Sequence, residues 1–154
     1  MRWLLAATLL IVACGPENPL PGYKPASGDE RAAVVRAVEG YYALRTRAIE
    51  TGDLQPLFAA YPKIASGEDR AKGINSARFY VFDLMRGLGH TQLSLKLEAY
   101  EPIRVWVKGS AAVAYVHGIE SFPNRTGPDS SGEFYTRFEL VRDANDWSIE
   151  RTDE

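Results

Sequence analysis

Apolar residues recur at steps of three and four along residues 29–51, which is the spacing of one face of an α-helix. Charged residues fall largely on the other side of this pattern. The apolar stripe consists of Val34, Ala37, Tyr41, Leu44 and Ala48. We therefore predict a long amphipathic helix that begins with a capping box at residues 27–30 and ends near Gly52.

Two shorter helices are expected after the first. One runs from Asp53 to about Tyr61 and stops at Pro62, because proline cannot continue a helix. Helical spacing returns in residues 74–88, and glycines at positions 87 and 89 end it. The polar stretch between these two helices predicts no defined element.

From residue 93 the period changes to two, because Leu93, Leu95 and Leu97 alternate with polar side chains. This alternation predicts a β-strand, which can continue past a bend at Pro102 as far as Val107. Three more strands are expected. A tight turn at 108–110 leads into the first, residues 111–122, and a polar loop at 124–132 leads into the second, which carries Phe134, Phe138 and Leu140. A turn at 143–146 leads into the last strand, which carries Trp147 and Ile149. Helices followed by an antiparallel meander predict an α+β fold, with the three helices packed on one sheet.

The N-terminal segment has the form of an export signal. Arg2 precedes an apolar run, residues 3–13, that would span roughly 16 Å as a helix, too short for a hydrocarbon core of about 30 Å. The run ends in Ile11-Val12-Ala13-Cys14, which resembles the bacterial lipobox. We predict that residues 1–13 are a lipoprotein signal peptide and that the thiol of Cys14 carries a diacylglyceryl anchor. The alternative is an ordinary secretory signal in which Cys14 is incidental.

Residues 14–28 are expected to be the lipidated cysteine and a flexible tether. Four prolines and three glycines follow Cys14 in this segment, which excludes a helix and predicts a reach of roughly 40 Å when extended. Gly15 replaces the aspartate that would resemble an inner-membrane retention signal. The expected location is the cell envelope, at the outer membrane if the organism has two membranes.

The length, cysteine content and net charge of the chain narrow the classes of protein to which it can belong. A chain of 154 residues suits one folded domain, which we place at residues 29–154. Cys14 is the only cysteine, so no disulfide can form within the chain. The formal net charge of −2 lacks the basic excess of nucleic-acid-binding domains, and no nucleic-acid partner is predicted.

Three segments in order resemble the nuclear transport factor 2-like superfamily, a cystatin-like α+β group that includes the SnoaL-like and ketosteroid-isomerase-like proteins. They are Tyr41-Tyr42 followed by residues 50–54, Val107-Lys108-Gly109 followed by residues 112–116, and the closing segments 138–142 and 146–149. The resemblance covers about residues 29–154. It implies a curved antiparallel sheet wrapped around the long helix as a cone with an apolar pocket, and it makes a homodimer one expected assembly.

His117 is the strongest single candidate for catalysis, because an imidazole can act as acid or base near neutral pH. It lies in mid-strand, where its side chain faces either the pocket or solvent. Asp83, among aromatic residues of the third expected helix, is a second candidate, although a solvated helix pair with Arg86 explains it more simply. The expected pocket-lining residues are Tyr41, Tyr42, Phe82, Tyr115 and His117.

No metal site and no cofactor are predicted. His90 and His117 lie far apart in sequence, and neither belongs to a cluster with metal-ligand spacing. The chain has no phosphate loop, dinucleotide fingerprint or Gly-x-Ser-x-Gly elbow. The aspartate base and acidic hydrogen-bond donors of the isomerase-like proteins cannot be placed on this chain residue by residue.

The leading hypothesis is a non-catalytic module of the cell envelope, held to membrane lipid through Cys14. It would use the cone for a small apolar ligand or the sheet for an envelope protein partner. The rival hypothesis is a small isomerase, dehydratase or hydrolase that uses His117 or Asp83. A third is a purely structural protein with a filled cone.

Overall fold

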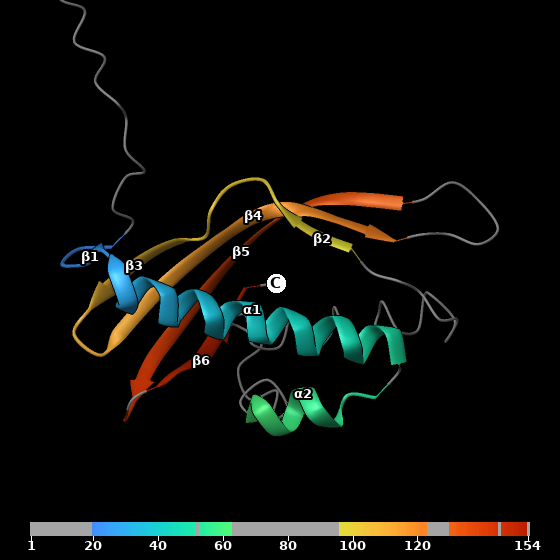
Figure 1. The fold of residues 1–154 in the computed structure, drawn as a ribbon, viewed down its shortest axis with the longest axis horizontal. Coiled ribbons are helices and arrows are strands. Elements are labelled where there is room, and N and C mark those ends of the chain that lie inside the picture. The colour runs from blue at the N-terminus through green and yellow to red at the C-terminus, as the bar shows by residue number, and fades with distance from the viewer. Residues whose placement is uncertain (1–19, 52, 63–95, 123–129, 145, 154) are drawn as a thin grey trace, which may run out of the picture.

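The computed structural model describes residues 20–51, 53–62, 96–122, 130–144 and 146–153. Within these residues, a long helix α1 (Gly28–Thr51) lies across one face of a curved antiparallel sheet. A short helix α2 (Gln55–Ala60) lies beside the C-terminal half of α1 (Figure 1). The predicted α+β class is therefore confirmed, while the expected third helix at 74–88 lies outside the described residues.

The sheet has six strands in the described part of the chain. They are β1 (Lys24–Pro25), β2 (Lys96–Ala99), β3 (Arg104–Lys108), β4 (Ala111–Phe122), β5 (Ser130–Asp143) and β6 (Asp146–Thr152). The order is β1-β3-β4-β5-β6, and β2 pairs with β4 further along the same edge as β3. The expected bend at Pro102 is thus the place where one predicted strand divides into β2 and β3.

The core lies between α1 and the inner face of the sheet. Val34, Val38 and Tyr41 of α1 are buried against Phe138 and Leu140 of β5. Burying an aliphatic or aromatic side chain of this size stabilises a fold by about 1.5–3 kcal/mol relative to leaving it exposed. The buried face of α1 is the stripe that the sequence predicts, which explains why this helix forms and where it packs.

β4 and β5 form the longest hairpin and position the residues discussed below. Their register runs from Ala111 opposite Val141 to Phe122 opposite Ser130. β5 begins at Ser130, so residues 130–132 belong to the strand rather than to the expected polar loop. Strand pairing supplies backbone partners to these small polar residues, which overrides their preference for turns.

Residues 20–27 differ from the expected flexible tether. The backbone N–H of Tyr23 donates to the carbonyl of Leu20 in a turn, and the next residues form β1. β1 pairs with the edge of β3, and the N–H of Ala26 donates to the carbonyl of Val105 at 2.9 Å. The proline in β1 is compatible with pairing because β1 is an edge strand. We name residues 20–27 the strap.

Candidate functional site

β4 divides its side chains between the two faces of the sheet. Ala112, Ala114 and Val116 lie in the core with α1. Side chains alternate along a strand, so Tyr115 and His117 point to the opposite face, which we call the outer face. His117 therefore lies on the side of the sheet that α1 does not cover.

Tyr41 and Tyr42 lie on the other side of the sheet from His117. Both are buried in α1, and their rings contact Phe138 edge-on at centroid distances of 5.3 and 5.5 Å. The structure thus places the two helix tyrosines in the aromatic core and does not bring them together with His117 or Tyr115. The remaining sequence candidates, Phe82 and Asp83, lie outside the described residues.

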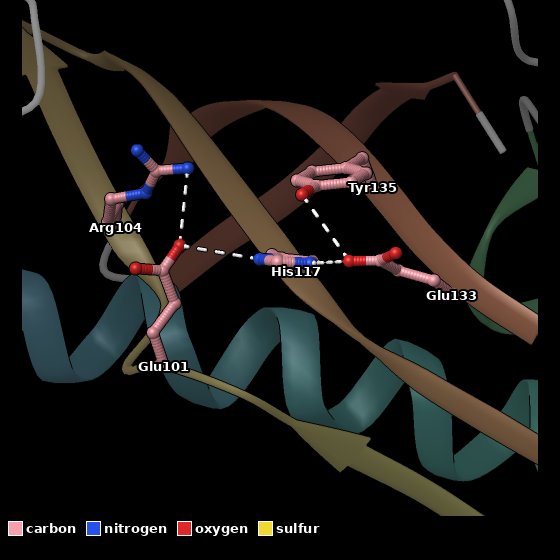
Figure 2. Close-up of polar contacts among 5 residues, drawn as sticks. All are labelled: Glu101, Arg104, His117, Glu133 and Tyr135. Atoms are coloured by element: carbon pink, nitrogen blue, oxygen red, sulfur yellow. Dashed lines mark hydrogen bonds and ion pairs between the residues drawn. The ribbon is translucent and has the colours of Figure 1, made fainter.

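His117 is held between two carboxylates. Its Nε2 atom lies 2.6 Å from Oε1 of Glu133 on β5, and its Nδ1 atom lies 3.9 Å from Oε1 of Glu101 in the β2–β3 bend (Figure 2). A neutral imidazole can donate from one nitrogen only, whereas an imidazolium donates from both. The short contact with Glu133 is therefore the one that orients the ring.

Two tyrosines enclose the imidazole. Tyr135, directly opposite His117 on β5, stacks on the ring with centroids 3.9 Å apart and an interplanar angle of 13°. Tyr100 meets it edge-on at 5.0 Å, and the backbone N–H of Tyr100 donates to the carbonyl of His117 at 3.0 Å. These contacts leave only 18% of the His117 side chain exposed. The ring is fixed in position by its neighbours.

Charge around the two tyrosines is mixed but mainly acidic. The Tyr135 hydroxyl donates to Oε1 of Glu133 at 3.5 Å, and Arg104 pairs with Glu101 at 3.3 Å. The pKa of the Tyr135 phenol is raised above its ordinary value, first by partial loss of hydration and then by the negative charge of Glu133. We name Tyr100, Glu101, Arg104, His117, Glu133 and Tyr135 the outer-face cluster.

The outer-face cluster has one element of catalytic geometry. A carboxylate that orients an imidazole is the arrangement of many general bases, and Glu133 does this for His117. A general base also needs its second nitrogen directed at a substrate. Here that nitrogen faces Glu101, and aromatic rings cover the imidazole on two sides. The arrangement is therefore better suited to holding a surface in shape than to removing a proton.

A second polar feature lies inside the core, where sequence reasoning did not place one. Arg45 of α1 and Glu120 of β4 form an ion pair through two contacts, 2.5 Å between Nη1 and Oε1 and 3.4 Å between Nη2 and Oε2. The residues are only 2% and 3% exposed. The Tyr42 ring centroid lies 6.0 Å from the guanidinium carbon, which adds a cation–π contact.

The sequence did contain a signal for this pair. Arg45 lies four residues after Tyr41 and three before Ala48, so it falls on the apolar stripe of the helix. Glu120 lies an even number of residues from Ala114 and Val116 on β4, so its side chain faces the same side as these core residues. A charged residue at a core position on each of two facing elements predicts a buried ion pair, because neither charge is tolerated alone.

The part of the chain that the structure describes contains neither a metal-binding cluster nor a membrane-spanning helix. There, no group of three or more histidine, cysteine, aspartate or glutamate residues could hold a metal ion. Within the same ranges, no helix is both long enough and apolar enough to cross a membrane.

Comparison with known proteins supports the fold. No protein-family model matches the chain, and no curated protein matches its sequence. The structure of Aln2 from a Streptomyces species is similar with a TM-score of 0.54 at 10% identity, covering 82% of this chain and 90% of that one. A variant of Rv3472, described as a function unknown protein from Mycobacterium tuberculosis, is similar with a TM-score of 0.53 at 15% identity, covering 80% and 72%. These matches show a shared α+β fold.

Proposed function

We propose that the chain is a cell-envelope lipoprotein whose nuclear transport factor 2-like domain is a non-catalytic module that binds a protein partner through the outer face of its sheet. The observation that carries this proposal is the exposure of two large aromatic residues on that face. Tyr100 is 55% exposed and Tyr135 is 67% exposed. Tyrosine is enriched at the centres of protein interfaces, where its ring and hydroxyl both find partners.

The same region of the outer face is acidic. Glu98 on β2 and Glu133 on β5 lie on either side of Ile119, because both strands pair with β4 at that residue. Glu101 adds a third carboxylate beside His117, and its pair with Arg104 offsets part of that charge. Acidic groups around exposed tyrosines favour a cationic partner, through ion pairs at the rim and cation–π contacts with the rings. We therefore assign the partner a segment rich in arginine or lysine.

The outer-face cluster is also built before any partner arrives. His117 fixes the ring of Tyr135 by stacking, and Glu133 is fixed by its contact with His117. Side chains that are already ordered lose less conformational entropy on association, so more of the interaction energy remains as affinity. This is a physical role for His117 that requires no reaction.

The anchor and the enzyme alternative have unequal support. The lipid anchor rests on the lipobox that ends at Cys14. The enzyme alternative has no matching support among the described residues, because His117 and the helix tyrosines lie on opposite faces of the sheet. We therefore propose the binding module and not an isomerase, dehydratase or hydrolase.

Site-specific photo-crosslinking in the producing cell tests the proposal. A photoreactive phenylalanine analogue replaces Tyr135 in one strain and the exposed Glu39 of α1 in a control strain. We expect a discrete adduct of higher mass from position 135 and none from position 39, and Glu133→Gln should weaken it. An adduct at twice the mass of the chain would make the partner a second copy. No adduct, or the same adduct from both positions, would contradict the proposal.

A further inference from the structure

The strap fixes the point where the chain enters the domain. Leu20, Pro21, Gly22 and Tyr23 form a turn closed by the backbone bond from Tyr23 to Leu20, with Gly22 at φ +84°. A proline followed by a glycine with positive φ fits a type II turn. β1 then pairs Lys24 with Val107 and Pro25 with Trp106. Residues 20–25 are therefore held at the edge of the sheet, beside β3.

The side chain of Lys108, at the end of β3, lies against the strap. Its Nζ atom lies 5.9 Å from the centroid of the Tyr23 ring. A side chain added at Gly22 would meet Lys108 Nζ at 3.2 Å, so the lysine lies directly against the turn. Lys24 and Lys108 are both exposed. We name residues 20–25 and 108–110 together the strap pole.

We propose that the strap pole faces the lipid bilayer and contacts its anionic headgroups, while the acidic outer-face cluster points away from the membrane. This inference rests on the proposed lipidation of Cys14. Six residue steps separate Cys14 from Leu20, and even a fully extended chain covers only about 20 Å in that distance. The strap pole is thus the part of the domain that the anchor holds nearest to the lipid.

The chemistry of the strap pole suits a membrane surface. Two lysines with long apolar stems can bring their ammonium groups to phosphate oxygens, and Tyr23 adds an aromatic ring of the kind found at the headgroup level. The neighbouring β5–β6 turn is mixed in charge, with Arg142, Asp143 and Asp146. The attraction is therefore local to the strap, and the short connection to Cys14 is the main cause of the orientation.

The orientation separates the two surfaces along the longest hairpin. The strap pole lies at one end of the sheet, and the β4–β5 strand ends that carry Ser121 and Ser131 lie at the other (Figure 1). The eleven residue steps from position 110 to position 121 span roughly 36 Å along β4. Glu133 lies only two residues from Ser131, so its carboxylate is presented on the far side from the bilayer.

Energy transfer to labelled lipid headgroups tests this orientation. Cys14 is acylated in the mature lipoprotein, so an introduced cysteine is its only free thiol. Ser110→Cys and Ser131→Cys place a donor dye at either end of the hairpin, both at exposed positions. The full lipoprotein is incorporated into vesicles of phosphatidylethanolamine and phosphatidylglycerol with acceptor-labelled headgroups.

We expect transfer from position 110 to exceed transfer from position 131 by at least about twofold, given their separation along β4. Equal transfer, or greater transfer from position 131, would overturn the orientation. Flotation of the same vesicles reports anchoring independently. Protein that fails to float refutes the lipid anchor and the orientation with it, whereas protein that floats with equal transfer refutes the orientation alone.

Discussion

Arg45 and Glu120 form a two-point ion pair in the core, joining the C-terminal half of α1 to the end of β4 across 75 positions of sequence. The pair brings opposite charges together where water is excluded. Its attraction offsets a desolvation cost of several kcal/mol for each ion, so the intact pair contributes little net stability. Its importance is that neither charge can be left alone.

Removing one partner should therefore be far more damaging than removing both. Arg45→Met and Glu120→Leu, each alone, are expected to lower the free energy of unfolding by about 3–5 kcal/mol, because each leaves an uncompensated buried charge. The double substitution should recover much of this loss. The measurement is denaturant unfolding of the full chain, followed by the fluorescence of the buried Trp106 and Trp147.

A matched control separates burial from charge. Arg47 lies two residues away on α1 but is exposed, so Arg47→Met should change the free energy of unfolding by less than about 0.5 kcal/mol. If Arg45→Met cost no more than Arg47→Met, the buried pair would not have the role that we give it.

Gly118 is required by the close approach of β2 to β4. A side-chain carbon added there would overlap the carbonyl oxygen of Glu98, which is backbone and cannot rotate away. We expect Gly118→Ala to lower the free energy of unfolding by about 1–3 kcal/mol, as overpacking does. It should also speed hydrogen exchange at the Tyr100 amide, which bonds to His117. Gly132→Ala is the control, since an added carbon there meets nothing within 4 Å, and equal effects of the two changes would contradict this account.

Much of the fold could be predicted, because the spacing of apolar residues along a helix or strand shows directly which of its faces is buried. The stripe through Val34 and Tyr41 predicted α1, and β4 was expected and found at Ala111–Phe122. The strap could not be predicted, because proline and glycine report turns but not which strand edge a segment will join. That pairing depends on β3, more than seventy residues further along the chain.

The candidate site was predictable only in part. His117 was identified by its chemistry, but the sequence left open which face of β4 it occupies. Its partner Glu133 lies sixteen residues further along the chain, and only the register of β4 and β5 shows that it reaches the imidazole. Register depends on long-range pairing, which no local pattern encodes.

Tyr135 should ionise at higher pH than an ordinary tyrosine. Partial loss of hydration and the charge of Glu133 raise its pKa in the folded state. A raised folded-state pKa means that its contribution to stability is present below the unfolded pKa and is lost as pH rises through the folded value. We expect Glu133→Gln to shift the titration of Tyr135 downward, as measured by NMR of ring-labelled tyrosine. An unchanged titration would show that the carboxylate does not act on the phenol.

Cys14→Ala should release the protein from the membrane. The diacylglyceryl group has no other thiol to join, because Cys14 is the only cysteine. Each buried methylene contributes about 0.8 kcal/mol to membrane attachment, so loss of the two or three acyl chains that we propose would abolish stable binding. Fractionation and gel mobility are the measurements. A variant that stays in the membrane fraction and migrates unchanged would refute the lipoprotein assignment.

The chemistry of the outer-face cluster predicts selectivity for cationic peptides. A peptide rich in arginine should bind the full chain in detergent at low salt, because Glu101 and Glu133 supply opposite charge and Tyr100 and Tyr135 supply aromatic faces. Added salt should weaken the binding, since exposed charges are screened over about 10 Å at 0.1 M. A glutamate-rich peptide of the same length should not bind.

Substitution locates this binding on the molecule. Tyr135→Ala removes one aromatic face and the stacking that orders His117, so we expect at least about a tenfold loss of affinity, equal to about 1.4 kcal/mol. Val141→Ala changes another exposed apolar residue near the other end of β5, where it pairs with Ala111, and should leave the affinity unchanged. Fluorescence anisotropy of the labelled peptide measures both. If the two substitutions weaken binding equally, or neither does, the peptide binds elsewhere and the cluster is not the recognition surface.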